Sequence, residues 1–87
     1  MLLFVPTVAR CGGLRVVIHT NDHRPANVHV IGKGCEAVFE PNCPTGPVKL
    51  RENYRFNQSE LTSIEGCLTH LLGTVCEAWE RLHGDTL

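Results

Sequence analysis

The sequence predicts an α+β fold: a small antiparallel sheet of four or five strands with one long C-terminal helix packed on one face. Three observations lead to this prediction. Two apolar segments flank a Gly-Gly pair, a later segment alternates its residue types, and the last third of the chain has helical periodicity. The chain has 87 residues, 43% of them hydrophobic, so we expect a single domain over residues 1–87.

The sheet is predicted to begin with a hairpin. Residues 1–5 form a short N-terminal extension, and residues 6–11 form the first strand. Gly12-Gly13 then separates that strand from residues 14–20, a run rich in β-branched residues that predicts the second strand. A two-residue glycine turn between two such runs is typical of antiparallel pairing.

Further strands are predicted beyond a polar turn. Residues 27–31 form the third strand, and residues 35–40 form the fourth after a glycine-rich turn. The fourth segment alternates between an apolar set of residues and a set that contains two glutamates, as expected of a strand covered on one face. Residues 48–50 add a brief edge strand after a proline-rich loop, so the sheet is predicted to span residues 6–50.

The last element is a helix predicted over residues 57–83. Asn57 is a favourable N-cap, and Glu60 at the third helical position completes a capping box. Apolar residues then recur at alternating steps of three and four, and they form a stripe wide enough to lie across a sheet. The stripe consists of Leu61, Ile64, Leu68, Leu71, Val75, Ala78 and Leu82.

The five cysteines are predicted to be reduced. Their number is odd, and no Cys-x-x-Cys pair is present. The apolar run at residues 2–5 is too short for a signal peptide, and no segment is long enough to cross a membrane. We therefore expect a cytoplasmic protein without membrane contact, whose thiols are small core residues and which has no disulfide framework.

One polar stretch, residues 20–30, is the predicted functional site. Asparagine, aspartate and proline suit a turn, but a turn does not also need two imidazoles and a guanidinium. A guanidinium can hold a phosphate, and two imidazoles can act as general acid and base in RNA cleavage without a metal. The candidate catalytic residues are His23, His29 and Arg24. The candidate binding residues are Asn21, Asp22, Asn27 and His19.

Two other interpretations of this stretch stay open. The two candidate catalytic histidines, with Asp22 or His19, offer nitrogen and oxygen ligands, but their spacing matches no strong zinc pattern. We therefore expect neither a metal nor another cofactor. In a purely structural interpretation Asp22 caps the turn, Pro25 stiffens it and the imidazoles bond to backbone groups. The net charge of −1 gives no global basic field for nucleic acid.

A series of short motifs runs along nearly the whole chain. The motifs are Pro6-Thr7-Val8, Gly12-Gly13, Asp22-His23-Arg24-Pro25, Val28-His29-Val30, Glu36-Ala37, Gln58-Ser59-Glu60-Leu61 and Trp79-Glu80. In this series the chain resembles a bacterial family known as domain of unknown function 4160. Ala26 stands where the family has its second proline, and Asn27 stands where it has its middle histidine. An asparagine is a poor metal ligand and cannot shuttle protons at neutral pH.

The resemblance also implies a function. Members of the family are often encoded beside a small partner protein, in pairs interpreted as toxin–antitoxin modules. The resemblance thus implies that this protein is the partner-binding component of such a two-protein module. A small protein is the expected partner, with RNA or a second copy of the chain as alternatives. We expect the partner to bind at the edge formed by Asp22 to His29. The competing hypothesis is an enzyme, a metal-independent ribonuclease that uses His23, His29 and Arg24.

Overall fold

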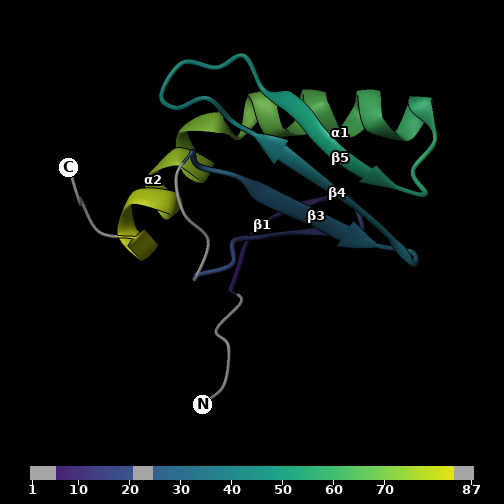
Figure 1. Ribbon diagram of the computed structural model, residues 1–87, viewed down its shortest axis with the longest axis horizontal. Helices are drawn as coiled ribbons and strands as arrows, with labels where there is room; N and C mark the ends of the chain where they lie inside the picture. Colours follow the sequence, from purple (N-terminus) through teal and green to yellow (C-terminus); the bar gives the residue numbers. More distant parts are fainter. Residues whose placement is uncertain (1–5, 21–24, 84–87) are drawn as a thin grey trace.

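The structure, a computed structural model, describes residues 6–20 and 25–83. Five antiparallel strands form one sheet in the order β1-β2-β3-β4-β5, so each strand pairs with its neighbours in sequence (Figure 1). The strands are β1 (Thr7–Cys11), β2 (Leu14–Val17), β3 (Val28–Gly32), β4 (Cys35–Glu40) and β5 (Lys49–Tyr54). The predicted α+β fold with an antiparallel sheet is confirmed.

Two tight turns fix the pairing of the central strands. Gly12, with a φ of 62°, lies in the turn between β1 and β2, as the Gly-Gly pair predicts. Between β3 and β4 both turn residues have positive φ, 56° at Lys33 and 74° at Gly34. Such a turn matches the right-handed twist of the flanking strands. It places Gly32 directly opposite Cys35, and the register along β3 and β4 follows from that pair.

The last strand is longer than predicted. β5 begins at Lys49 and ends at Tyr54, whereas the sequence predicts a brief strand over residues 48–50. Its pairing with β4 continues past an irregularity between Val38 and Phe39, where the register shifts. All six residues of β5 are exposed, so no alternation of apolar residues marks the strand in the sequence.

The C-terminal part forms two helices instead of the single long helix that the sequence predicts. α1 (Gln58–His70) and α2 (Leu72–His83) meet at Leu71, whose φ of −97° and ψ of 15° leave the helical range. The predicted capping box is present at the start of α1. The Glu60 backbone N–H donates to the Asn57 side chain at 2.8 Å, and the Asn57 backbone N–H donates to the Glu60 carboxylate at 2.9 Å.

The prediction of reduced cysteines is wrong for four of the five. Cys11 in β1 is bonded to Cys67 in α1, and Cys43 in the loop after β4 is bonded to Cys76 in α2. Only Cys35 is a free thiol. The partners are 56 and 33 residues apart in sequence, so the pairing depends on the fold and is not visible in local spacing.

The break between the helices fits the positions of the two disulfides. Cys67 and Cys76 are nine residues apart, which is about two and a half turns, so a straight helix would place them on opposite sides. The break at Leu71 allows both cysteines to reach their partners. Buried residues of α2 accordingly include Cys76 and Trp79, beside the Val75 and Ala78 of the predicted stripe.

The core lies between one face of the sheet, here called the inner face, and the two helices. Side chains of the sheet in this core include Val16, Val28, Val30, Ala37 and Phe39, all 0–1% exposed. The helices contribute Leu61, Ile64, Leu68, Val75, Ala78 and Trp79. Leu71, Leu72 and Leu82 are only partly buried and pack against this cluster. Neither described helix has the length and apolarity needed to cross a membrane.

Candidate functional site

The outer face of the sheet, opposite the inner face, is the one that neither helix covers. Directly paired residues of neighbouring strands point to the same side of a sheet, so the register defines which side chains share this face. One row across the strands contains Thr7, Val17, His29, Val38 and Glu52. The next contains Arg10, Arg15, Ile31, Glu36 and Tyr54.

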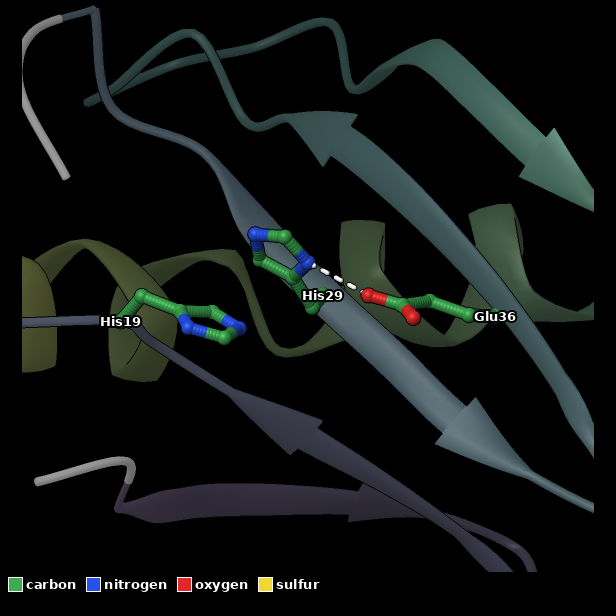
Figure 2. A group of neighbouring side chains, drawn as sticks. All are labelled: His19, His29 and Glu36. Carbon is green, nitrogen blue, oxygen red and sulfur yellow. Dashed lines mark hydrogen bonds and ion pairs between the residues drawn. The ribbon is translucent and has the colours of Figure 1, made fainter. Parts of the chain in front are cut away.

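Three polar side chains meet on this face from three different strands or strand ends. Glu36 on β4 lies opposite Ile31, so it is the diagonal neighbour of His29 on β3. His29 lies opposite Val17 of β2, and His19 follows two residues later on the same side of the chain. Diagonal neighbours on one face are within reach of long and aromatic side chains. We call His19, His29 and Glu36 the His-His-Glu cluster (Figure 2).

The geometry of the cluster is tight. The Nδ1 of His29 donates a hydrogen bond to Oε2 of Glu36 at 2.8 Å. The rings of His19 and His29 lie 4.1 Å apart between centroids and are tilted by 57°. Figure 2 shows the His19 ring reaching toward that of His29. All three residues are half-buried, so the cluster is held by its neighbours and still faces solvent.

One ring nitrogen of the cluster has no hydrogen-bond partner within residues 6–20 and 25–83. The Nε2 of His19 is buried and has no hydrogen-bond partner among the described residues. Buried polar atoms in folded proteins nearly always have a partner, and an exception calls for an explanation such as a catalytic role or a bound ion. The cluster therefore has the features of a functional site as well as those of a polar contact between strands.

The arrangement can support two kinds of chemistry. A carboxylate that accepts from one ring nitrogen of a histidine orients the imidazole, which suits general acid–base catalysis. Two imidazoles and a carboxylate that converge on one point can also act as metal ligands. Either use needs access from solvent, which the exposed part of Glu36 (39% of its side chain) provides.

The structure brings together only some of the residues that the sequence singled out. His19 and His29 are in contact. Asn27 instead has a local structural contact: it is 5% exposed, and its side-chain amide donates to the Pro25 carbonyl at 3.2 Å. The other predicted site residues lie outside the described residues, and these are Asn21, Asp22, His23 and Arg24.

Sequence reasoning missed the contribution of Glu36 to the site. The alternation in residues 35–40 assigns this glutamate to the polar side of its strand and gives no partner. The signal that could have found it is the two-residue turn at Lys33-Gly34, because a turn of fixed length sets the register of the strands on both sides. Counting back from the turn places Glu36 diagonally next to His29.

A second polar contact on the outer face joins two residues of β5. The Tyr54 hydroxyl donates to Oε1 of Glu52 at 2.7 Å, and Tyr54 lies directly opposite Glu36. The hydrogen bond to Glu52 and the charge of that carboxylate raise the pKa of the Tyr54 phenol above its ordinary value, with a smaller contribution from Glu36. β5 thus carries an acidic neighbour of the cluster as well as an exposed aromatic ring.

A separate hollow lies between the loop after β4 and α2. It has a volume of about 550 Å³, and Pro25, Cys43, Trp79 and Glu80 are among its lining residues. The Trp79 indole N–H is buried and has no hydrogen-bond partner among the described residues. No residue of the His-His-Glu cluster lines this hollow.

Comparison of the chain with known proteins found no matching family model, no matching curated protein and no matching solved structure. The resemblance to domain of unknown function 4160 stays a prediction from the motifs.

Proposed function

We propose that this protein is the partner-binding component of a toxin–antitoxin-like two-protein module, and that a small protein partner binds along β5. The observation that supports this function is the exposure of β5, whose six residues are all exposed. Leu50 and Tyr54 are large hydrophobic residues that are 37% and 55% exposed. Among the described elements β5 pairs only with β4, so it forms one edge of the sheet.

An exposed edge strand can accept another strand. Its outward backbone N–H and C=O groups are available to an extended segment of a partner, and flanking side chains then provide specificity. The charged residues Lys49, Arg51 and Glu52 and the irregularity in register restrict which strands can pair with this edge. We expect a partner segment with acidic residues facing Lys49 and Arg51, and apolar residues against Leu50 and Tyr54.

Charge favours a protein over RNA as the partner. The register places three basic and three acidic residues on the outer face: Arg10, Arg15 and Lys49 against Glu36, Glu40 and Glu52. Nucleic acid binding relies on Lys and Arg that neutralise phosphates, and a balanced face offers no net positive field for it. A protein partner with mixed charges fits this face better.

The experiment is to co-express the protein with the product of the neighbouring gene and to measure the affinity of the complex. The variant Leu50→Asp/Tyr54→Asp places charge at both exposed apolar positions, and we expect a loss of affinity of at least about 10-fold, or about 1.4 kcal/mol. Ser63→Asp/Thr74→Asp adds two charges at exposed positions of α1 and α2 and is the matched control. Equal affinity of the two variants contradicts binding along β5.

The same proteins, run alone by size-exclusion chromatography with light scattering, identify the competing partners. A stable dimer that the β5 variant dissociates means that the partner is a second copy of the chain. Purely electrostatic binding to RNA weakens steeply with salt, on the order of 10³-fold or more for several phosphate contacts. Binding to a short RNA that persists in 0.5 M salt therefore means that the protein recognises RNA specifically and that its partner is nucleic acid. Either result contradicts the proposed function.

A cytoplasmic location is part of this proposal. The two disulfides weigh against it, because disulfides are rare in reduced compartments. The number of thiols that react with an alkylating agent at the moment of cell lysis tests the location directly. Five reactive cysteines support the cytoplasm, whereas one, Cys35, indicates an oxidising compartment.

A second candidate function is a metal-independent ribonuclease, and the contact of His29 with Glu36 favours it. The carboxylate would orient His29 as a general base, as in other histidine–carboxylate pairs. His29→Gln should then abolish cleavage of RNA while leaving its binding intact. Cleavage that persists in this variant removes the ribonuclease hypothesis.

A further inference from the structure

We propose that the His-His-Glu cluster binds one divalent transition-metal ion of the Zn²⁺ type. His19 and His29 supply two nitrogen ligands, and Glu36 supplies one carboxylate oxygen. This inference does not rest on partner binding along β5, because the metal ligands are on β3, on β4 and two residues after the end of β2. It does exclude the metal-independent use of His29 as a base.

The positions of the ligand atoms support the site. One ligand atom from each of the three residues can be chosen so that all three lie within 4.8 Å of one another. Ligands around a tetrahedral Zn²⁺ with bonds of about 2.1 Å are about 3.4 Å apart. The pair formed by His29 Nδ1 and Glu36 Oε2 lies at 2.8 Å because a proton bridges the two atoms. An ion that binds both atoms displaces this proton to solvent, and the atoms then separate to the ligand spacing. The remaining distances, from the His19 nitrogen to the ligand atoms of the other two residues, are no more than 4.8 Å.

The buried Nε2 of His19 is a second, independent observation. It has lost contact with water and gains no hydrogen bond among the described residues. A metal ion between the rings would give this atom a partner. His29 lies on β3 and His19 lies two residues after the end of β2, with ring centroids 4.1 Å apart, so the two rings are neighbours before an ion arrives.

The chemistry of the ligands determines the class of ion. Imidazole nitrogens suit Zn²⁺ and its neighbours in the first transition row, whereas Mg²⁺ and Ca²⁺ prefer sites made of oxygen ligands only. Two histidines and one carboxylate are three protein ligands, and a Zn²⁺ ion with three protein ligands keeps a position for water. All three residues are half-buried, so the ion and its water are reachable from solvent.

The experiment is calorimetric titration of the full chain, stripped with a chelator, with Zn²⁺ alone. All proteins carry Cys35→Ser, because the only free thiol could bind zinc elsewhere. We expect one ion per chain. His19→Gln and Glu36→Gln should each weaken binding by at least about 100-fold, since even outer-shell changes cost on the order of 10–100-fold. His70→Gln changes an exposed histidine of α1 and should bind as the parent does.

Two additional measurements separate loss of the metal site from loss of the fold and identify the ligand types. Circular dichroism shows whether each variant is folded, and Glu36→Gln preserves an acceptor for His29, so loss of binding by the folded variant comes from the missing charge. Co²⁺ in place of Zn²⁺ reports nitrogen and oxygen ligation through its visible absorption. No heat of binding in the parent, or unchanged binding in both His19→Gln and Glu36→Gln, overturns the proposal.

Discussion

The two faces of the sheet are built from the same strands, but only one of them is covered by the helices and the other gathers polar side chains. The inner face carries Val16, Val28, Val30, Ala37 and Phe39, which are buried beneath the helices. The outer face carries the His-His-Glu cluster, the Tyr54–Glu52 contact and no helix. Within one strand, the residues that point inward therefore pack in the core, and those that point outward include the polar residues of the candidate site. Phe39 and Glu36, three residues apart on β4, are the clearest case.

The difference between the faces predicts at which positions a substitution should leave the stability of the protein largely unchanged. A buried side chain on the inner face contacts both sheet and helix, so its loss leaves a cavity that the disulfide-linked framework cannot easily close. A polar side chain on the outer face contacts one or two neighbours and water, and its replacement leaves little strain. Four predictions test the comparison, beginning with the largest expected effect.

Phe39→Ala on the inner face should destabilise the protein by about 3–5 kcal/mol, because the ring is 1% exposed within the core. Glu36→Gln on the outer face of the same strand should cost less than about 1 kcal/mol. The free energy of unfolding in urea, followed by the fluorescence of the single tryptophan, gives both values. Similar losses for the two variants would break the comparison, since a core ring and a partly exposed carboxylate of one strand would then contribute equally to stability.

Removal of a disulfide should have the next largest effect on stability, because one disulfide links α1 to β1 and the other links α2 to the loop after β4. Replacement of Cys11 and Cys67 by alanine removes a link across 56 residues, and replacement of Cys43 and Cys76 removes one across 33. Each pair should lower the unfolding free energy by about 2–5 kcal/mol, and the longer loop should cost more. Denaturation under oxidising and reducing conditions measures both, and a parent protein insensitive to reductant contradicts the prediction.

The same comparison shows which parts of the molecule are predictable from the sequence. Local patterns identify the inner face and the start of α1: the glycine turn, the alternation in residues 35–40, and the capping box at Asn57 all have local causes. The disulfide Cys11–Cys67 depends on chain segments that meet only in the folded state. The apolar spacing of three and four residues continues across the break at Leu71, so helical periodicity alone predicts one helix.

The outer face was only half predictable for the same reason. His19 and His29 belong to the polar stretch of the sequence, and their unusual composition is a local signal. Glu36 becomes their neighbour through the register of β3 and β4, and Tyr54 through the pairing of β5. Cross-strand neighbours depend on turn lengths and bulges, so a search for sites in a β-rich sequence should count outward from each tight turn.

Asn57→Ala should have a smaller effect that leaves both faces of the sheet unchanged. The side chain of Asn57 accepts from the Glu60 backbone at 2.8 Å, and its loss leaves an N–H of the first helical turn without a partner. We expect a loss of about 1 kcal/mol in unfolding free energy. Asn57→Ser keeps a capping oxygen and should retain most of the stability. A serine variant as unstable as the alanine variant would contradict the capping role.

The smallest predicted effect is on the pKa of Tyr54. It tests whether the charged residues of the outer face act on one another at short range. The neutral phenol donates to Glu52 at 2.7 Å, whereas the phenolate would repel that carboxylate and, more weakly, Glu36. The pKa is therefore raised in the folded protein. Any stabilisation from this contact is complete below the pKa of the unfolded chain and is lost as the pH rises through the folded value.

Absorbance of tyrosinate measures this pKa without ambiguity, because the chain has one tyrosine. Glu52→Gln should move the titration midpoint down toward the ordinary value, since it removes both the charge and the strongest acceptor. Glu36→Gln should move it less, because Glu36 contributes only through its charge. Glu65→Gln, at an exposed position of α1, should leave it unchanged. If the midpoint moves equally in all three variants, the shift comes from net charge, and the outer face does not act as a local unit.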